Sequence, residues 1–390
     1  MKALTWQGKR KVEVSEVPDP RIQEPTDIVI KVTSTAICGS DLHLYELLGP
    51  FMHAGDVLGH ETMGIVQEVG SAVTSVQPGD RVVIPFNISC GHCWMCTRGL
   101  QSQCETTQVR SHGKGAAFLG YSELYGQVPG GQAEYLRVPH GDYGAIKVGS
   151  DLPDHRYLFL SDILPTAWQG VRYADVPEEG SLAVFGLGPV GQLAARIGRH
   201  LGYRVLGIDP VPERRAMAAR HGIETLDFTK ETATALRDLT SRGPDAVLDA
   251  VGMEAHGSPT AALRQQATGL LPDPAAQQVM QTASMDRNIV LTAATDAVRR
   301  GGTISISGVY AGAATPMPMV KLFDKQIQIR QGQCNVRSWT DELLPLTEDS
   351  KDPIGLDDLV THTKPLSEGP EMYSTFQKKQ DGCIKVVLQP

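Results

Sequence analysis

The stretch that decides the fold is Ser181-Leu182-Ala183-Val184-Phe185-Gly186-Leu187-Gly188-Pro189-Val190-Gly191, an apolar run followed at once by the spacing G-x-G-x-x-G. The apolar run predicts a buried strand, residues 192–201 have the spacing of an amphipathic helix, and residues 203–208 predict a second strand that ends in Asp209. Glycines in such a turn let the backbone approach a pyrophosphate, whose charge is met by the N-terminus of the helix. Because strand, turn, helix, strand and acid follow in this order, we expect a dinucleotide-binding unit rather than a glycine-rich turn without a ligand.

The same stretch indicates which dinucleotide is bound. Asp209 should accept hydrogen bonds from the adenosine ribose and repel a 2′-phosphate, which favours NAD over NADP. Arg214 follows closely enough to complicate that preference. The residues expected to bind the cofactor here are Gly186, Gly188, Val190, Gly191, Asp209 and Arg214.

Four more strand-like segments follow this unit, at residues 224–228, 246–251, 303–309 and 326–331. Together with the first two, they make six strands with helical segments between them. This alternation predicts an α/β fold with a doubly wound parallel sheet.

The segments at residues 246–251 and 303–309 are separated by about fifty residues, more than one crossover helix requires. Residues 286–300 have helical apolar spacing and are the expected crossover helix. Residues 256–284 are left as an insertion, with a short helix expected at 275–283. Because the insertion leaves the carboxyl end of a parallel strand, where a dinucleotide binds, it could cover the adenosine end of NAD. A surface decoration or a subunit contact is equally open.

The amino-terminal part of the chain predicts a different architecture. Segments at residues 28–32, 62–69 and 81–84 are short, rich in β-branched residues and separated by turns. They indicate a compact, β-rich, barrel-like domain. The apolar residues 383–388 look like a strand that returns to this domain.

A chain of 390 residues exceeds one ordinary core. We expect residues 1–158 and 334–390 to form the barrel-like domain, and residues 159–333 to form the dinucleotide-binding domain inserted into it.

The formal net charge of −8 disfavours nucleic acid or an anionic membrane as a partner. The sequence shows no apolar signal core and no membrane-length run, so we expect a cytoplasmic protein whose thiols stay reduced.

Residues 38–61 contain ligand types that zinc prefers. Cys38 and His60 supply a thiolate and an imidazole, and Glu61 adds a carboxylate as a fourth ligand or as a partner behind the ligands. Ser40 and His43 stand beside the thiolate, where a hydroxyl and an imidazole could pass a proton to water. Taken alone, the same residues fit a buried cysteine, a core histidine and a surface glutamate equally well.

The most specific signal is a set of four cysteines spaced C-x2-C-x2-C-x7-C. Thiolates at these spacings can surround one tetrahedral metal ion and leave no position for water, which predicts a structural zinc. An iron–sulfur cluster is the competing interpretation, and a disulfide pair or a nucleic-acid-binding zinc ribbon fits less well. The four residues are Cys90, Cys93, Cys96 and Cys104.

Asp162 lies in the apolar setting Leu160-Ser161-Asp162-Ile163-Leu164, where a carboxylate needs a partner. The N-terminus of a helix would satisfy it as well as a metal would, and the residues alone leave both open. The glycine-rich residues 111–131, with aromatic Phe118, Tyr121 and Tyr125, predict a long loop that is mobile or lines a site.

Taken in order, these motifs resemble the medium-chain zinc-dependent alcohol dehydrogenases, which combine a GroES-like barrel domain with a Rossmann domain. The resemblance covers essentially the whole chain. Residues 130–135 and 160–166 are most similar to the branch of glutathione-independent formaldehyde dehydrogenase and formaldehyde dismutase. The resemblance implies a catalytic zinc on Cys38, His60 and Asp162, with the aspartate where the family often has a cysteine.

The resemblance also implies roles for neighbouring residues. Thr166 would pack against the nicotinamide, Ser40 would bind the substrate oxygen, and His43 would end the proton relay. Phe86 would wall the substrate pocket. The bulk of Phe86 and Trp168 favours small alcohols or formaldehyde over polyols.

The implied activity is hydride transfer between NAD and a small alcohol or hydrated aldehyde, with formaldehyde among the candidates. Two zinc ions per chain are implied, one catalytic and one structural. A general alcohol or polyol dehydrogenase of the same family is the alternative. A zinc-free reductase would not need the cysteine motifs, and a non-catalytic zinc protein would not need the dinucleotide motif. We expect a small-molecule substrate and a homo-oligomer, either a dimer or a tetramer.

Overall fold

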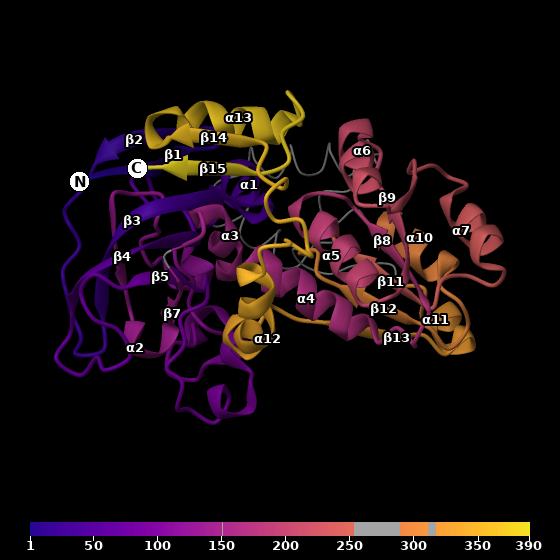
Figure 1. Cartoon of the computed structure of the whole chain (residues 1–390), viewed down its shortest axis with the longest axis horizontal. Coiled ribbons are helices and arrows are strands. Elements are labelled where there is room, and N and C mark those ends of the chain that lie inside the picture. The colour runs from indigo at the N-terminus through magenta and orange to yellow at the C-terminus, as the bar shows by residue number, and fades with distance from the viewer. Residues whose placement is uncertain (150, 253–288, 311–316) are drawn as a thin grey trace. The chain divides into compact units, whose positions relative to one another are not determined.

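The computed structural model describes residues 1–149, 151–252, 289–310 and 317–390. This part of the chain divides into two compact units (Figure 1). The first unit combines Met1–Pro165 with Cys334–Pro390, and the second unit is Thr166–Gln333. The first unit is therefore assembled from two separate stretches of the sequence, and the second from one.

The first unit is built mainly on antiparallel strands. A two-stranded sheet pairs β1 (Lys2–Gly8) with β2 (Lys11–Glu16). A seven-stranded sheet has the order β14-β15-β3-β4-β5-β7, and β6 pairs with β3. The strands of this larger sheet are β3 (Ile28–Ile37), β4 (Glu61–Val69), β5 (Arg81–Ile84), β6 (Tyr135–Val138), β7 (Ile146–Lys147), β14 (His362–Pro365) and β15 (Val386–Gln389).

The pairing of β3 with β4 brings two distant points of the chain together. Ala36 lies opposite Glu61, so the chain that leaves β3 at Cys38 lies beside the chain that enters β4 at His60. β-branched residues suit such a half-buried, pleated surface. Buried residues of this kind form the core of the sheet, among them Ile28, Ile30, Val32, Val66, Val82 and Ile84.

The last strand of the sheet comes from the far end of the sequence. β15 pairs with β3, with Val386 opposite Ile37. Lys385 therefore reaches the same end of the sheet as Glu61, although 324 residues separate the two in the chain.

The helices of the first unit range from four to thirteen residues in length. They are α1 (Gly39–Glu46), α2 (Gly141–Gly144), α3 (Asp154–Leu158), α12 (Val336–Glu348) and α13 (Gly369–Lys378), and α4 (Ile163–Ala174) continues into the second unit. Single 3₁₀ turns are η1 (Gly49–Phe51), η2 (Cys96–Arg98), η3 (Gln101–Gln103), η4 (Arg110–His112), η5 (Glu123–Tyr125), η6 (Phe159–Ser161) and η8 (Leu366–Glu368).

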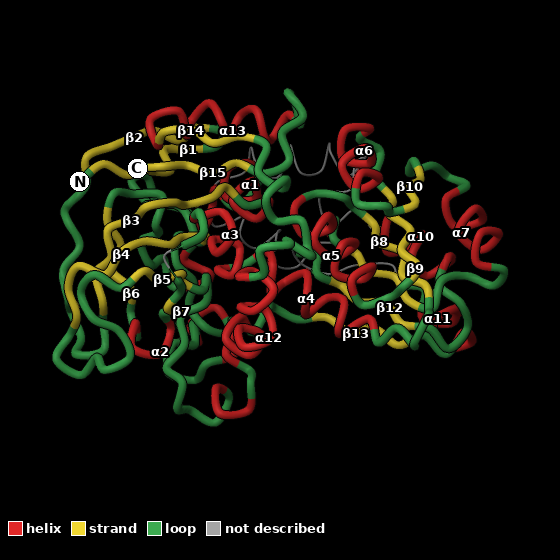
Figure 2. Tube along the Cα trace, in the orientation of Figure 1, coloured by secondary structure: helices red, strands yellow, loops and turns green. Residues whose placement is uncertain are grey.

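The second unit is a six-stranded parallel sheet with helices between its strands (Figure 2). The strand order is β10-β9-β8-β11-β12-β13, so the chain starts at the centre and winds outward in both directions. This is the order of the doubly wound dinucleotide-binding fold, and the predicted fold class is confirmed. The strands are β8 (Ser181–Phe185), β9 (Arg204–Ile208), β10 (Glu224–Leu226), β11 (Ala246–Asp249), β12 (Thr303–Ile306) and β13 (Gln328–Gln331).

Several helices of this unit bury apolar residues against the sheet, whereas Val320 and Phe323 of the last helix, Met319–Lys325, are exposed. α5 lies against β8 and β9, and α10 lies against β11 and α7. Val290, Leu291 and Ala294 of α10 share one core with the buried strand residues. The helices are α5 (Pro189–His200), α6 (Pro212–Arg220), α7 (Thr232–Thr240), α10 (Ile289–Ala297) and α11 (Met319–Lys325).

Several boundaries differ from the sequence prediction. α5 begins at Pro189 rather than at residue 192, because the fixed φ of proline suits the first helical position. Among the described residues, the crossover helix covers Ile289–Ala297 and ends at Ala297 rather than at residue 300. The predicted insertion at 256–284, with its helix at 275–283, lies outside the residues that the structure describes. None of the described helices has the length and apolar character needed to cross a membrane.

Candidate active site

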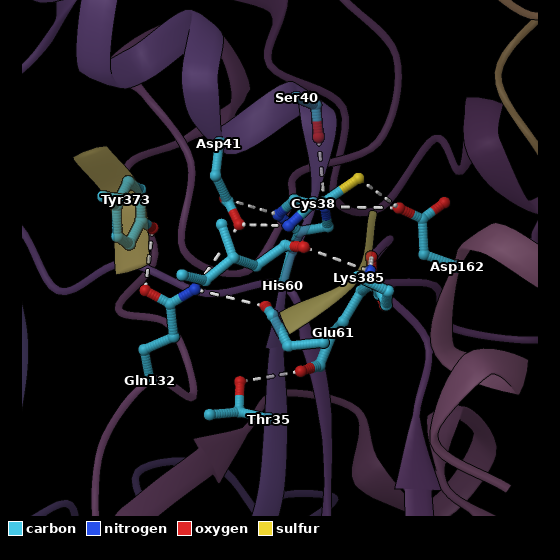
Figure 3. A network of polar contacts seen from close by, with 12 residues as sticks. Thr35, Cys38, Ser40, Asp41, His60, Glu61, Gln132, Asp162, Tyr373 and Lys385 are labelled. Carbon is cyan, nitrogen blue, oxygen red and sulfur yellow. Dashed lines mark hydrogen bonds and ion pairs between the residues drawn. The ribbon is translucent and has the colours of Figure 1, made fainter. Parts of the chain in front are cut away.

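Side chains from distant parts of the first unit meet at one point (Figure 3). Cys38 Sγ lies 3.4 Å from Asp162 Oδ2, and His60 Nε2 lies 3.2 Å from the same oxygen. One ligand atom from each of these residues and from Glu61 lies within 4.8 Å of the others, and all four residues are buried. The structure thus brings together the four residues that the sequence suggested for a catalytic metal.

The backbone around each ligand explains this meeting. Cys38 lies between β3 and α1, and His60 directly precedes β4. Asp162 lies between η6 and α4, and the preceding residue is held in place because its carbonyl accepts the amide of Phe86 at 3.0 Å. The carboxylate of Asp162 faces Cys38 and His60, which supports a metal ligand where the sequence left a helix cap equally open.

Asp41 orients two of these residues, and reasoning from the sequence missed it. The amide of Cys38 donates to Asp41 Oδ2 at 2.9 Å, and His60 Nδ1 lies 3.0 Å from Asp41 Oδ1. Burial lowers the pKa of His60, but the charge of Asp41 and the hydrogen bonds to Asp162 and Asp41 raise it well above its usual value. With Nδ1 held by Asp41, Nε2 is the nitrogen that faces the cluster. An acid in the first turn after Cys38 was the available signal.

Lys385 holds Glu61 from behind, and the sequence analysis missed this residue too. Its Nζ donates to Glu61 Oε1 at 2.6 Å and to the carbonyl of Ile37 at 3.2 Å, and both charged side chains are fully buried. Burial opposes the charge of Lys385, but the carboxylate of Glu61 outweighs it and raises the pKa of the lysine. The signal was a lone charge within the apolar residues 383–388.

Ser40 and His43 both lie on α1. Ser40 Oγ is 3.1 Å from His60 Nε2, so its hydroxyl reaches the cluster. His43 is buried and follows Ser40 by one helical turn. A hydroxyl at the cluster and an imidazole behind it are the parts that a proton relay requires.

The charges of the cluster favour a bound cation. Burial raises the pKa of Cys38 to about 11, and the charges of Asp162 and Glu61 add to this shift. Glu61 Oε2 is buried without a hydrogen-bond partner. Two carboxylates and a thiol gathered against one ammonium leave an excess of acidic groups in the interior, which a metal ion relieves. Sulfur, imidazole nitrogen and carboxylate oxygen are the donors of catalytic zinc sites, so these residues fit zinc.

The four-cysteine segment forms a second cluster of donors. Cys93 Sγ lies 3.9 Å from Cys104 Sγ, and the four sulfur atoms lie within 4.8 Å of one another. Burial raises the pKa of Cys93, but hydrogen bonds from the amides of Cys96 and Glu105 outweigh it and lower the pKa to about 6. No disulfide joins any of the seven cysteines, all of which lie in the described part of the chain. Four converging sulfurs fit a structural zinc.

An aromatic cluster lies against His60. The rings of Phe86 and Tyr121 stand edge-on to the imidazole, with centroids 6.3 and 6.2 Å away. Phe118 packs edge-on to Phe86 at 5.0 Å and stacks on Tyr125 at 4.1 Å. The glycine-rich segment predicted as a mobile or site-lining loop therefore supplies three aromatic side chains beside the candidate metal site.

The glycine-rich turn of the second unit joins β8 to α5. A Cβ at Gly191 would lie 1.7 Å from the carbonyl oxygen of Gly186, so only glycine permits this close approach. Asp209 Oδ2 accepts the amide of Leu187 at 2.7 Å, and Arg214 Nη1 lies 3.7 Å from the same oxygen. Asp209 thus stabilises the turn itself, a role that the sequence analysis did not foresee.

The other predicted residues of this unit, Thr166 and Trp168, lie on α4. The indole of Trp168 is buried, and the guanidinium of Arg172 lies 5.5 Å from its ring.

Known proteins are similar to this chain in both sequence and fold. The pattern of the alcohol dehydrogenase GroES-like domain matches residues 24–149, and that of the zinc-binding dehydrogenases matches residues 189–269. The chain is 41% identical over 396 residues to the uncharacterized zinc-type alcohol dehydrogenase-like protein AdhB of Bacillus subtilis, covering 100% of both chains. The chain belongs to the medium-chain zinc-dependent alcohol dehydrogenase family.

Two further members of the family are similar over the whole chain. Formaldehyde dismutase of Pseudomonas putida is 32% identical over 418 residues, covering 100% of this chain and 97% of that protein. The solved structure of alcohol dehydrogenase TADH from Thermus sp. ATN1 gives a TM-score of 0.80 at 34% identity, covering 100% of this chain and 99% of that one. The enzyme is therefore an oxidoreductase of the alcohol dehydrogenase type, and its two donor clusters fit two zinc ions.

Proposed function

We propose that this enzyme transfers hydride between NAD and a small primary alcohol or hydrated aldehyde, with formaldehyde in its range. The observation that carries the proposal is the buried cluster of Cys38, His60 and Asp162 with an aromatic wall beside it. The cluster supplies the donors of a catalytic zinc, and the wall limits the room beside it.

In this proposal, different residues of the first unit bind the metal and transfer the proton. When bound by Cys38, His60 and Asp162, zinc acts as a Lewis acid that makes a substrate hydroxyl more acidic. Ser40, whose Oγ lies 3.1 Å from His60 Nε2, would accept the proton of that hydroxyl and release its own proton in the same step. His43, one turn further along α1, would take up the proton released by Ser40 and end the relay.

Glu61 has a supporting part in this proposal. Its Oε1 is neutralised by Lys385, and its Oε2 is left without a hydrogen bond beside the ligands. Glu61 would therefore be a further oxygen ligand for the metal.

The second unit would bind the cofactor, which accepts the hydride. The turn from Gly186 to Gly191 leaves the N-terminus of α5 open to a pyrophosphate. Asp209 receives the adenosine ribose and disfavours a 2′-phosphate, so the enzyme prefers NAD. Arg214 lies beside Asp209 and weakens this discrimination.

The size of the substrate is inferred from the aromatic rings. Phe86, Phe118 and Tyr121 are buried around one side of His60 and leave apolar surface there. Such a surface accepts a short carbon chain but leaves the hydroxyls of a polyol without hydrogen-bond partners. The similarity to a protein named formaldehyde dismutase supports the same substrate class.

A substrate screen tests the proposal directly. The purified enzyme is assayed with NAD and methanol to hexanol, with sorbitol and xylitol, and with formaldehyde in the presence and absence of glutathione. We expect the highest kcat/KM for short alcohols or formaldehyde, and no requirement for the thiol. A clear preference for polyols would replace this proposal with that of a general polyol dehydrogenase of the same family.

A further inference from the structure

A line of four buried polar side chains connects the C-terminal helix α13 to His60 (Figure 3). The hydroxyl of Tyr373 on α13 donates to Gln132 Oε1 at 2.8 Å, across 241 residues of sequence. Gln132 Nε2 lies 3.4 Å from Asp41 Oδ2 and 3.2 Å from the carbonyl of Ala36. Asp41 Oδ1 faces His60 Nδ1 at 3.0 Å.

The direction of the hydrogen bonds that join Tyr373, Gln132 and Asp41 is fixed. Burial and the nearby charge of Asp41 raise the pKa of Tyr373 well above its usual value, so its hydroxyl remains protonated. The tyrosine donates to the carbonyl end of the Gln132 amide, and the NH₂ end must then face the carboxylate of Asp41. Rotation of the amide would instead place its oxygen against that carboxylate.

The backbone of Gln132 is held as firmly as its side chain. Its amide donates to the carbonyl of Leu58 at 2.9 Å, and its carbonyl accepts the amide of Leu4 at 2.8 Å. Gly59 packs against it so closely that a Cβ there would lie 2.4 Å from Gln132 Cγ. The residue next to His60 in the chain is therefore in direct contact with Gln132.

These contacts determine which carboxylate oxygen of Asp41 faces His60. The amide of Cys38 and Gln132 Nε2 both lie on Oδ2, which leaves Oδ1 directed at His60 Nδ1. A histidine held in this way keeps its proton on Nδ1 and offers Nε2 to a metal. The same contacts moderate the charge of Asp41 and hence the basicity of the imidazole.

We propose that Gln132 and Tyr373 are positioning residues that act through Asp41 to fix the ring and the donor strength of His60, and so determine how tightly the catalytic metal is held. The inference rests on the proposed role of His60 as a metal ligand. It adds two residues to the metal site that do not contact the metal and that come from the two separate stretches of the first unit.

The test compares zinc release from Tyr373→Phe and Gln132→Met with release from the wild-type holoenzyme. Zinc transfer to a coloured chelator is followed in time, with zinc content determined beforehand. We expect the catalytic zinc to leave roughly tenfold faster in both variants, the lower end of the effect of losing a direct partner of a ligating histidine. The zinc of the four-cysteine site should leave at the wild-type rate. The cobalt-substituted Tyr373→Phe enzyme should also show shifted visible absorption bands.

Tyr45→Phe is the matched control, because the ring of Tyr45 lies 5.5 Å from that of Tyr373 but outside the hydrogen-bonded line. It should release zinc at the wild-type rate. Wild-type release in Tyr373→Phe, or equal acceleration at both zinc sites, would overturn the inference and leave only a structural role. If Gln132→Met fails to fold, Tyr373→Phe decides the question, because it removes a single hydroxyl. A wild-type enzyme with only one zinc per chain would instead refute the proposed function.

Discussion

At the scale of single residues, Glu61 and Lys385 depend on each other for stability, because neither charged side chain reaches solvent. Lys385→Met should destabilise the protein by about 3–5 kcal/mol, since it leaves an unpaired carboxylate in the interior. Urea unfolding of the wild type and the variant measures this difference. The double variant Glu61→Gln/Lys385→Met should recover a large part of the loss. If the double variant is no more stable than the single one, the carboxylate of Glu61 is not the cause.

Asp209 gives a second prediction at this scale. Asp209→Ser should weaken NAD and improve NADP, because the ribose acceptor and the repelling charge are removed together. The measurement is the ratio of kcat/KM for the two cofactors, and Arg214 should make the shift toward NADP larger. The carboxylate also holds the amide of Leu187, so some loss of affinity for both cofactors is expected. An unchanged ratio of the two kcat/KM values would show that Asp209 stabilises the turn but does not bind the adenosine ribose.

At the scale of elements, the short helix α3 determines where Asp162 lies. Its first residue, Asp154, accepts Ser34 Oγ of β3 at 2.7 Å and pairs with Arg81 of β5. Burial raises the pKa of Asp154, but the hydrogen bonds from Thr33 and Ser34 and the pairing with Arg81 outweigh it and lower the pKa below its usual value of 3.8. The ionised carboxylate therefore ties the segment before Asp162 to two strands of the sheet.

Asp154→Asn should lower stability near neutral pH by about 1.5–3 kcal/mol, the usual worth of hydrogen bonds to a charged group. A depressed pKa stabilises the fold above the ordinary value of 3.8, and this gain is lost as the pH falls through the folded value. The difference in Tm between the wild type and the variant should therefore shrink below about pH 4. A difference that is constant with pH would mean that the charge of Asp154 contributes nothing.

The elements also show what a sequence can and cannot predict. The turn from β8 to α5 was predictable because the apolar run, the glycine spacing and the acid lie within thirty residues of one another. The four-cysteine site was predictable for the same reason, because its ligands lie close together in the sequence. Asp41 and Lys385 were missed because their contacts depend on how α1 starts and on the register of β15 against β3. That register is set by tertiary packing, and no local pattern records it.

At the scale of the whole molecule, the two donor clusters should differ in how firmly they hold zinc. One consists of four sulfurs, and the other combines a sulfur, an imidazole and harder carboxylate oxygens. Zinc favours thiolate over carboxylate, so a chelator should remove the catalytic zinc and the activity first, with the fold intact. Zinc analysis, activity and circular dichroism during chelation measure this order. Loss of both ions in one step, or unfolding with the first loss, would contradict it.

The distance of 324 residues between Glu61 and Lys385 has a consequence for synthesis on the ribosome. At roughly 5–20 residues per second, Glu61 is made on the order of 15–65 seconds before its counter-ion. The continuous segment Thr166–Gln333 is complete well before Lys385 is translated. Nascent chains should therefore acquire a folded nucleotide-binding core early, while the metal-binding core stays open until the last strand leaves the exit tunnel. Loading of the catalytic zinc should accordingly follow the folding of Thr166–Gln333 and the arrival of Lys385.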